Sequence, residues 1–373
     1  MKELLDVIAG FVWGPLLLIP LLLLTGLYLT IVLRALQFHK LGYALWLALI
    51  KRKELGSAGD ISHYQALSVA LAATVGVGNI AGVATAIFLG GPGALLWMWV
   101  TGLVGMATKY SEAFLGVRFR RVDAVGEQSG GPQVYLSEGI PGRLGSCLAI
   151  SFAIAAAIAA FGIGNMVQSN TVAQSIEAEF GVATWVTGII LTAGAGIVIL
   201  GGIKWIGRFA AFFVPFMVIL YILGATWVIG VHIDALPGAL AMVFNDAFSG
   251  TAATGGFAGA TIAAAIRFGV ARGIFSNESG LGTGGIAAAA AQTSNPVRQA
   301  LVSMTQTFID TLVIVSLTGL VIIVTGVWTS GATGAVLTRM AFEAGLPGGW
   351  GGIIVTLSVA FFAFSTLMGW AYY

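Results

Sequence analysis

Apolar stretches of about 20 residues recur along the whole 373-residue chain, and they limit its possible folds more than any other feature. A helix of that length crosses the hydrocarbon core of a bilayer. Charged residues make up only 9% of the chain, whereas a soluble domain carries about 25%. The sequence therefore predicts an all-α, polytopic membrane protein. It contains no basic tract suited to nucleic acid, so we expect the lipid bilayer rather than a nucleic acid as partner.

Nine apolar ranges are predicted to span the membrane as a single transporter-sized domain over residues 1–373. The first range is too long for a signal peptide and lacks a small-residue cleavage site, so we interpret it as a retained span. The predicted spans are residues 11–34, 66–90, 94–116, 147–174, 183–203, 208–231, 250–271, 300–327 and 350–371.

Basic residues fall mainly in alternate loops, and such loops lie on one side of a membrane. Because cytoplasmic loops carry an excess of lysine and arginine, this side is predicted to be the cytoplasm. The N-terminus is then outside, in a multi-pass plasma membrane protein. The residues behind this orientation are Arg34, Lys40, Lys51, Arg52, Lys53, Arg118, Arg120, Arg121, Arg143, Lys204, Arg208, Arg272 and Arg298.

The second predicted span contains Gly76, Gly78, Asn79 and Gly82 within a few residues, which predicts a helix broken inside the membrane. A broken helix exposes carbonyls at the end of its first half, which attract a cation. It also exposes amides at the start of its second half, which attract a carboxylate. The alternative is that Gly78 and Gly82 form only a small-residue packing face.

The seventh predicted span is also rich in glycine, over residues 250–259, and it follows the second by five spans. An odd step reverses the direction of a helix across the membrane. Paired interruptions of this kind indicate the midplane site of a transporter built from two inverted repeats. We expect spans 2–6 to form the first repeat, the first span to be an extra N-terminal helix, and the second repeat to be truncated at Tyr373.

Four strings in order resemble the alanine or glycine:cation symporter family: Ala73–Gly82, Gly130–Pro132, Gly164–Gln168 and Phe275–Gly282. The resemblance implies a leucine-transporter-type inverted repeat of eleven spans in a prokaryotic plasma membrane. It also implies sodium-coupled uptake of L-alanine, glycine or a similar small amino acid, with Na⁺ as the coupling ion and no cofactor. The family pattern continues past Tyr373 for two further spans.

The resemblance also implies which residues bind substrate and sodium. The substrate carboxylate is expected at the Val77 and Gly78 amides, one sodium beside Asn79 and the Thr74 carbonyl, and a second between spans 2 and 9. The expected substrate-binding residues are Thr74, Gly76, Val77, Gly78, Asn165, Gln168, Phe257, Gly259, Thr366 and Trp370. The expected sodium ligands are Ala72, Thr74, Val75, Asn79, Ser365 and Thr366.

Two acids bear on the rival functions. Asp310 is the one acid clearly inside a predicted span, either a coupling group or the partner of a neighbouring polar side chain. Glu278 is expected in a structural or gating loop on the cytoplasmic side. An intramembrane enzyme is not expected, because the spans lack a histidine or cysteine set. A proton-coupled amino-acid transporter of the same fold, supported by Asp310 alone, and a cation channel are the remaining alternatives.

Overall fold

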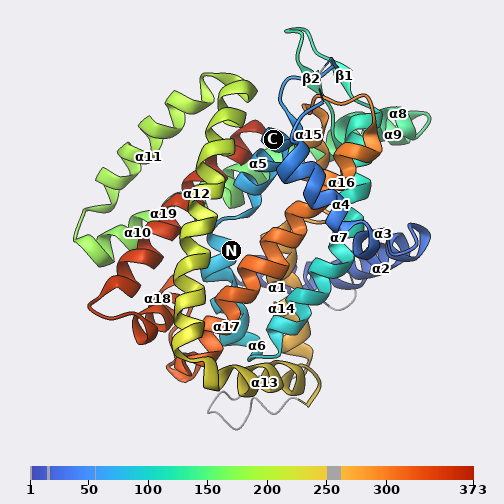
Figure 1. Cartoon of the computed structure of the whole chain (residues 1–373). Helices are drawn as coiled ribbons and strands as arrows, with labels where there is room; N and C mark the ends of the chain where they lie inside the picture. The colour runs from blue at the N-terminus through green and yellow to red at the C-terminus, as the bar shows by residue number, and fades with distance from the viewer. Residues whose placement is uncertain (1, 15–16, 55, 250–261) are drawn as a thin grey trace.

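The computed structural model describes the chain except for residues 1, 15–16, 55 and 250–261, and it is almost entirely helical (Figure 1). The only sheet in the described part is a hairpin of β1 (Arg121–Val122) and β2 (Gln128–Ser129). In the first part of the chain the helices are α1 (Lys2–Val12), α2 (Leu18–Val32), α3 (Leu36–His39), α4 (Leu41–Trp46), the π-helical η1 (Leu47–Lys51), α5 (His63–Thr74), the π-helical η2 (Gly78–Gly82), α6 (Val83–Gly90) and α7 (Ala94–Arg118).

The middle of the chain continues with α8 (Pro132–Gly139), α9 (Arg143–Ala159), the π-helical η3 (Ala160–Met166), α10 (Val167–Phe180), α11 (Thr184–Ile199), α12 (Gly202–Val231), the short η4 (Ile233–Ala235) and α13 (Leu236–Ser249). The last part contains α14 (Ile262–Asn277), α15 (Thr283–Ala289), α16 (Pro296–Thr307), the π-helical η6 (Phe308–Val315), α17 (Ser316–Val324), the short η7 (Val327–Thr329), α18 (Gly334–Gly345) and α19 (Trp350–Tyr372).

Each of the nine predicted ranges overlaps one or more of these helices, but several boundaries differ. The helix that contains 147–174 runs from Arg143 to Phe180, and α12 begins at Gly202 rather than at residue 208. The range 11–34 is not one helix, because α1 ends at Val12 and α2 begins at Leu18. The range 250–271 ends too early, because α14 continues to Asn277. Its glycine-rich part, residues 250–259, lies outside the described residues, and so do Phe257 and Gly259.

Four helices of the described part are long and apolar enough to cross a membrane: Arg143–Phe180, Gly202–Val231, Pro296–Val324 and Trp350–Tyr372. The bent pair His63–Thr74 and Gly78–Gly90 brings the number to five when it is counted as one span. These findings support a multi-pass membrane protein. The nine-span topology stays a prediction.

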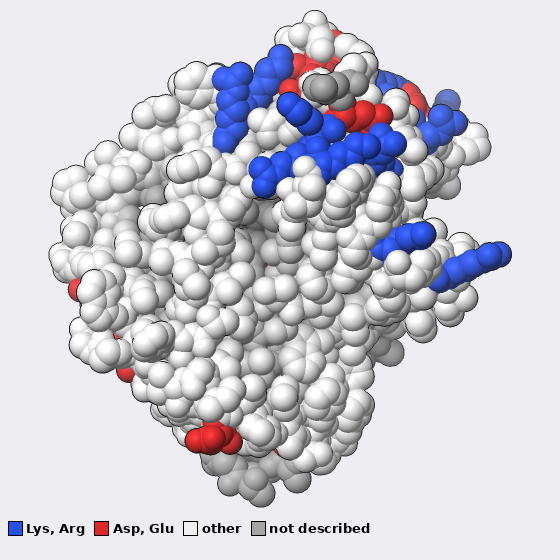
Figure 2. Space-filling view, in the orientation of Figure 1, with Lys and Arg blue, Asp and Glu red and all other residues white. Residues whose placement is uncertain are grey.

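The distribution of charge agrees with a protein embedded in a bilayer. Figure 2 shows a broad central surface without charged side chains, with basic side chains at its right edge and small acidic patches at its left edge. Most lysine and arginine side chains in this view gather at the end where the β1–β2 hairpin and the C-terminus lie, with acidic side chains among them, and the charged side chains seen at the opposite end are acidic (Figures 1 and 2). One predicted loop residue is misplaced, because Arg272 lies inside α14 over the ring of Phe275 rather than between spans.

Local sequence signals explain where the central helices begin. Ser62 and Gln65 form a capping box at the start of α5, so both residues satisfy amides that the first helical turn leaves free. Asn295 caps α16, whose first residue Pro296 suits that position because it has no amide proton to satisfy.

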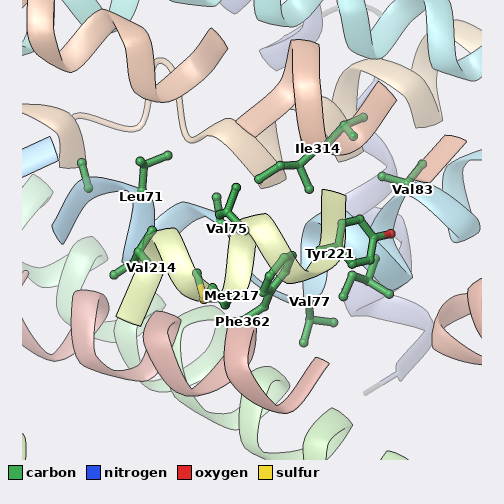
Figure 3. Close-up of a cluster of buried hydrophobic side chains, with 14 of the residues drawn as sticks. Leu71, Val75, Val77, Val83, Val214, Met217, Tyr221, Ile314 and Phe362 are labelled. Carbon is green, nitrogen blue, oxygen red and sulfur yellow. The ribbon is translucent and has the colours of Figure 1, made fainter. Parts of the chain in front are cut away.

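The two halves of the second predicted span lie in the centre of the fold. Figure 3 shows Leu71, Val75, Val77 and Val83 of this span among side chains of three other elements. Those side chains are Val214, Met217 and Tyr221 of α12, Phe362 of α19 and Ile314 of η6. All nine belong to one buried apolar cluster, which holds the break between the two halves in a fixed position.

Candidate functional site: two oxygen clusters at a broken helix

The second predicted span is broken between α5 and η2, at Val75–Val77, and its two halves meet at 52°. The break leaves backbone groups unpaired by the helix, and side chains satisfy several of them. The Gly76 amide donates to Asn79 Oδ1 at 2.9 Å, and the Asn79 amide donates to the Gly76 carbonyl at 3.1 Å. The predicted interruption is therefore present, and a side chain within it stabilises the turn.

On one side of the break, α19 brings two hydroxyls to the carbonyls at the end of α5. Ser365 Oγ lies 3.3 Å from the Ala72 carbonyl oxygen, and Thr366 Oγ1 lies 3.1 Å from the same atom and 3.5 Å from the Val75 carbonyl oxygen. Gly369 allows this approach, because a Cβ there would lie 2.6 Å from Ala73 Cα. These four oxygens, which we call the carbonyl–hydroxyl cluster, belong to residues predicted as sodium ligands.

On the other side of the break, the buried carboxylate of Asp310 accepts three side-chain hydrogen bonds. Asn79 Nδ2 donates to Oδ1 at 2.7 Å, while the hydroxyls of Ser276 and Thr311 donate to Oδ2 at 2.9 and 2.8 Å. No basic nitrogen lies within 4 Å of this carboxylate in the described part of the chain. We call Asn79, Ser276, Asp310 and Thr311 the Asp310 cluster.

Thr74 extends the polar network beyond the Asp310 cluster. Its hydroxyl donates to the Ala70 carbonyl and accepts from Gln306 Nε2 at 2.9 Å, and Gln306 also donates to the Asn277 carbonyl at 3.3 Å. The sequence interpretation did not include Gln306. The sequence contains a signal for Gln306, because an amide side chain inside an apolar span needs polar partners.

A second broken helix meets the first. Its break begins six residues beyond Arg272, the residue predicted to lie on the cytoplasmic side. The segment between α14 and α15 has positive φ angles at Glu278, Gly280 and Gly282, so the helix cannot continue through it. Ser276, Asn277 and Glu278 are all buried there. Glu278 therefore lies in a buried loop that interrupts a helix, and its position on the cytoplasmic side stays a prediction. The string Phe275–Gly282 marks a helix break rather than the end of a span.

Helix α7 anchors this second break through a buried ion pair. Lys109 Nζ lies 3.6 Å from Glu112 Oε2 and donates to the Glu278 carbonyl at 3.0 Å. Glu112 Oε1 in turn accepts from the amides of Gly280 and Gly282. Among the described residues, one lysine and three acids are buried. They contribute the ammonium of Lys109 and the carboxyls of Glu112, Glu278 and Asp310. When the carboxyls of Glu278 and Asp310 are ionised, an added cation would lower the cost of burying their charge.

Gln168 occupies the predicted position of the substrate carboxylate. Its Oε1 accepts from the Val77 amide at 3.2 Å, and it would lie 3.1 Å from a Cβ at Gly76. Thr366 Oγ1 would lie only 2.4 Å from that Cβ, so a side chain at position 76 would clash. A Cβ at Gly78 would lie 3.2 Å from the ring of Phe275. Gln168 and Thr366 therefore both lie at Gly76, and Phe275 lies at Gly78.

Two cavities lie along η3 and α10. One of about 350 Å³ is lined by Asn165, by Trp370 and by Tyr373 at the end of α19. The other, of about 310 Å³, is lined by Thr171, by Thr356 nearer the start of α19 and by Ala81 of η2. Asn165 and Trp370 thus meet in the first cavity rather than at the break itself. Gln168, only 2% exposed, lies between Asn165 and Thr171 in the sequence and is not among the residues that line either cavity.

A family model described as the sodium:alanine symporter family matches residues 1–373. The chain belongs to the sodium:alanine symporter family. Its members are transporters that use Na⁺ as the coupling ion, and they are not enzymes. This agrees with the resemblance found in the sequence.

Three relatives show the range of names within this family. The sodium/alanine symporter AgcS of Methanococcus maripaludis is 51% identical over all of this chain and 82% of its own. The putative sodium/proton-dependent alanine carrier protein YrbD of Bacillus subtilis is 40% identical over 86% of this chain and 67% of its own. The probable sodium/glutamine symporter GlnT of Bacillus subtilis is 37% identical over all of this chain and 77% of its own.

Proposed function

We propose that this protein carries alanine and glycine into a prokaryotic cell together with Na⁺, through a site at the break in its second span. The observation that carries the proposal is the presence of separate oxygen clusters on the two sides of that break. Sodium is a hard cation that prefers oxygen ligands, and carbonyls at a half-helix end supply them.

Each cluster is proposed to hold one sodium ion. The carbonyl–hydroxyl cluster would use the Ala72 and Val75 carbonyls with the hydroxyls of Ser365 and Thr366. The second ion would lie beside the Asn79 side chain and the Thr74 carbonyl, as the resemblance implies, with the carboxylate of Asp310 as an added ligand. Two buried carboxyls remain after Lys109 is paired with Glu112, and a sodium ion and a substrate ammonium would balance their charge.

The substrate carboxylate is proposed to replace Gln168 Oε1 at the Val77 amide and to contact the amide of Gly78. Gly76 and Gly78 would let it approach the backbone closely. Phe275, 3.2 Å from a Cβ at Gly78, and Gln168 would then limit the length of the substrate side chain. Thr74 and Thr366 would contribute hydroxyls, while Asn165 and Trp370 would line the path from one cavity. The roles expected of Phe257 and Gly259 stay predictions.

Inverted repeats would give this site access to each side of the membrane in turn. The two helix breaks meet at the Asp310 cluster, which supports a midplane site between repeats. The N-terminus would lie outside. The cavities lined by Asn165 and by Thr171, three residues before and three residues after Gln168, would provide the two access paths.

Uptake of labelled alanine into proteoliposomes tests the function, with sodium and proton gradients imposed separately. A sodium gradient should drive uptake at constant pH, and unlabelled glycine should compete. Leucine should compete poorly, because each extra methylene must displace packed side chains at about 1–3 kcal/mol. Uptake driven only by a proton gradient would favour the alternative coupling, for which the name of the YrbD relative provides a reason.

A further inference from the structure

An apolar groove of about 660 Å³ lies between helices α2 and α14. They touch where Ile19 packs against Val270 and Ile274, in a small core separate from the main one. The groove itself is lined by Leu23 and Leu24 of α2 and by Ala263 of α14. Leu24 remains 61% exposed, so the groove faces the surroundings of the molecule.

One charged residue, Arg267 of α14, lines this apolar groove. Its guanidinium lies 5.4 Å from the centre of the Phe268 ring, and among the carboxylates of residues 7–249 and 262–373 none lies within 4 Å of it. An arginine keeps its charge under all ordinary conditions. A charged side chain on the lipid-facing surface is costly unless it finds a polar partner. The groove therefore offers one strong anion-binding group beside a long apolar surface.

The position of Arg267 along α14 gives its depth in the bilayer. Ten residues separate it from Asn277, where α14 ends at the helix break. At 1.5 Å per residue this is about 15 Å, which equals half of a hydrocarbon core about 30 Å thick. If the break lies near the midplane, Arg267 lies at the boundary where phospholipid phosphates are found, on the side away from the basic loops.

We propose that this groove binds one anionic phospholipid, whose phosphate pairs with Arg267 and whose acyl chain lies against Leu23, Leu24 and Ala263. A planar guanidinium binds phosphate oxygens through two parallel hydrogen bonds. An anionic headgroup is favoured over a zwitterionic one because it brings no ammonium to compete with the arginine. This site is separate from the transport site and goes beyond the proposed function.

Native mass spectrometry of the purified full chain tests the proposal, with mixed micelles containing phosphatidylglycerol or phosphatidylcholine. The wild type should retain one phosphatidylglycerol per chain and little phosphatidylcholine. Arg267→Gln should weaken retention by roughly tenfold or more, as expected for loss of a charge-assisted hydrogen-bonded pair. Ala263→Phe should fill the groove and weaken retention while leaving the charge in place.

Arg121→Gln is the matched control, since it removes one arginine from the β1–β2 hairpin, where Arg121 pairs with Glu138. Retention in this variant should equal that of the wild type. Equal retention in Arg267→Gln and wild type would overturn the proposal, as would equal retention of the two lipids. Dimers without bound lipid would overturn it as well, because a second copy would then occupy the groove.

Discussion

The two clusters beside the broken second span hold different kinds of oxygen. The carbonyl–hydroxyl cluster is formed by neutral groups of two helices, α5 and α19. The Asp310 cluster is formed by a carboxylate with three donors and joins η2, α14 and η6. A cation in the first would interact with dipoles only, whereas a cation in the second would meet a formal negative charge in a region of low dielectric constant.

This difference suggests that the two proposed ions bind with different strengths. The ion beside Asp310 compensates a buried charge, so it should bind more tightly and contribute more to the stability of the protein. The ion in the carbonyl–hydroxyl cluster should bind more weakly, because its ligands also satisfy one another by hydrogen bonds when the ion is absent. Substitutions in each cluster test this order.

Asp310→Asn should have the largest effect, because it keeps the shape of the side chain and removes its charge. We expect the apparent sodium affinity in an alanine-binding assay to fall roughly 30- to 150-fold, the range for losing a charged ligand. Glu112→Gln is the control, since its carboxyl is already paired with Lys109. It should lower stability with little effect on sodium affinity. A stronger effect of Glu112→Gln on sodium would contradict the assignment.

Ser365→Ala should have a smaller effect, because it removes one neutral ligand from the carbonyl–hydroxyl cluster. We expect sodium affinity to fall roughly 3- to 10-fold, as for one neutral hydrogen-bonding group. Ser358→Ala is closely matched, since Ser358 is also buried on α19 and its hydroxyl has no hydrogen-bond partner in the described structure. Equal sodium affinities of the two variants would exclude Ser365 as a ligand.

Gly78→Ala should weaken alanine binding about fivefold, because the added methyl group approaches Phe275 to 3.2 Å at the proposed carboxylate position. Gly82 lies one turn along the same half-helix, and no atom lies within 4 Å of a Cβ added there. Gly82→Ala should therefore bind alanine as the wild type does. A packing role for both glycines predicts instead that the two variants lose thermal stability alike.

Glu54 lies outside the predicted spans and can be compared with Asp310. Its negative charge is already compensated by an ion pair with Arg298. Burial acts to raise its pKa, but hydrogen bonds from Ser294, Arg298 and Thr293 outweigh this and lower the pKa to about 2. Since 4.5 is the ordinary value, the ionised carboxylate stabilises the fold above about pH 4.5, and this contribution disappears as the pH falls through about 2.

Glu54→Gln should therefore lower the thermal midpoint at pH 7 by the equivalent of about 1 kcal/mol, a value reduced for solvent screening. Its difference from wild type should shrink as the pH falls below about 4.5. Sodium affinity should not change. If Glu54→Gln lowered sodium affinity as strongly as Asp310→Asn does, the proposed difference between Glu54 and Asp310 would be contradicted.

The sequence predicted the break in the second span, because glycines and an asparagine weaken a helix inside an apolar range. It also grouped Ser365 and Thr366 with the Ala72 and Val75 carbonyls through the family resemblance, and these atoms do meet. It missed the break after Asn277. The glycines of residues 250–259 predicted a break at an earlier position, although Phe275–Gly282 is one of the four strings that resemble the family.

The hydrogen bond between Gln168 and Val77 could not be predicted either. Asn165 and Gln168 are three residues apart, which suggested one face of a helix. They nevertheless have different surroundings, because the π-helical η3 immediately before α10 changes the helical periodicity. The sequence does not decide the role of Asp310, for a different reason. A single acid in a span does not identify its partners, and here they come from η2 and α14.

The most direct test of the central claim is the dependence of alanine binding on sodium, measured at equilibrium and constant pH with potassium as the control ion. If sodium and substrate share the break in the second span, alanine affinity should increase with sodium and not with potassium. By thermodynamic reciprocity, alanine should increase sodium affinity by the same factor. Alanine binding that ignores sodium and follows pH would contradict the account.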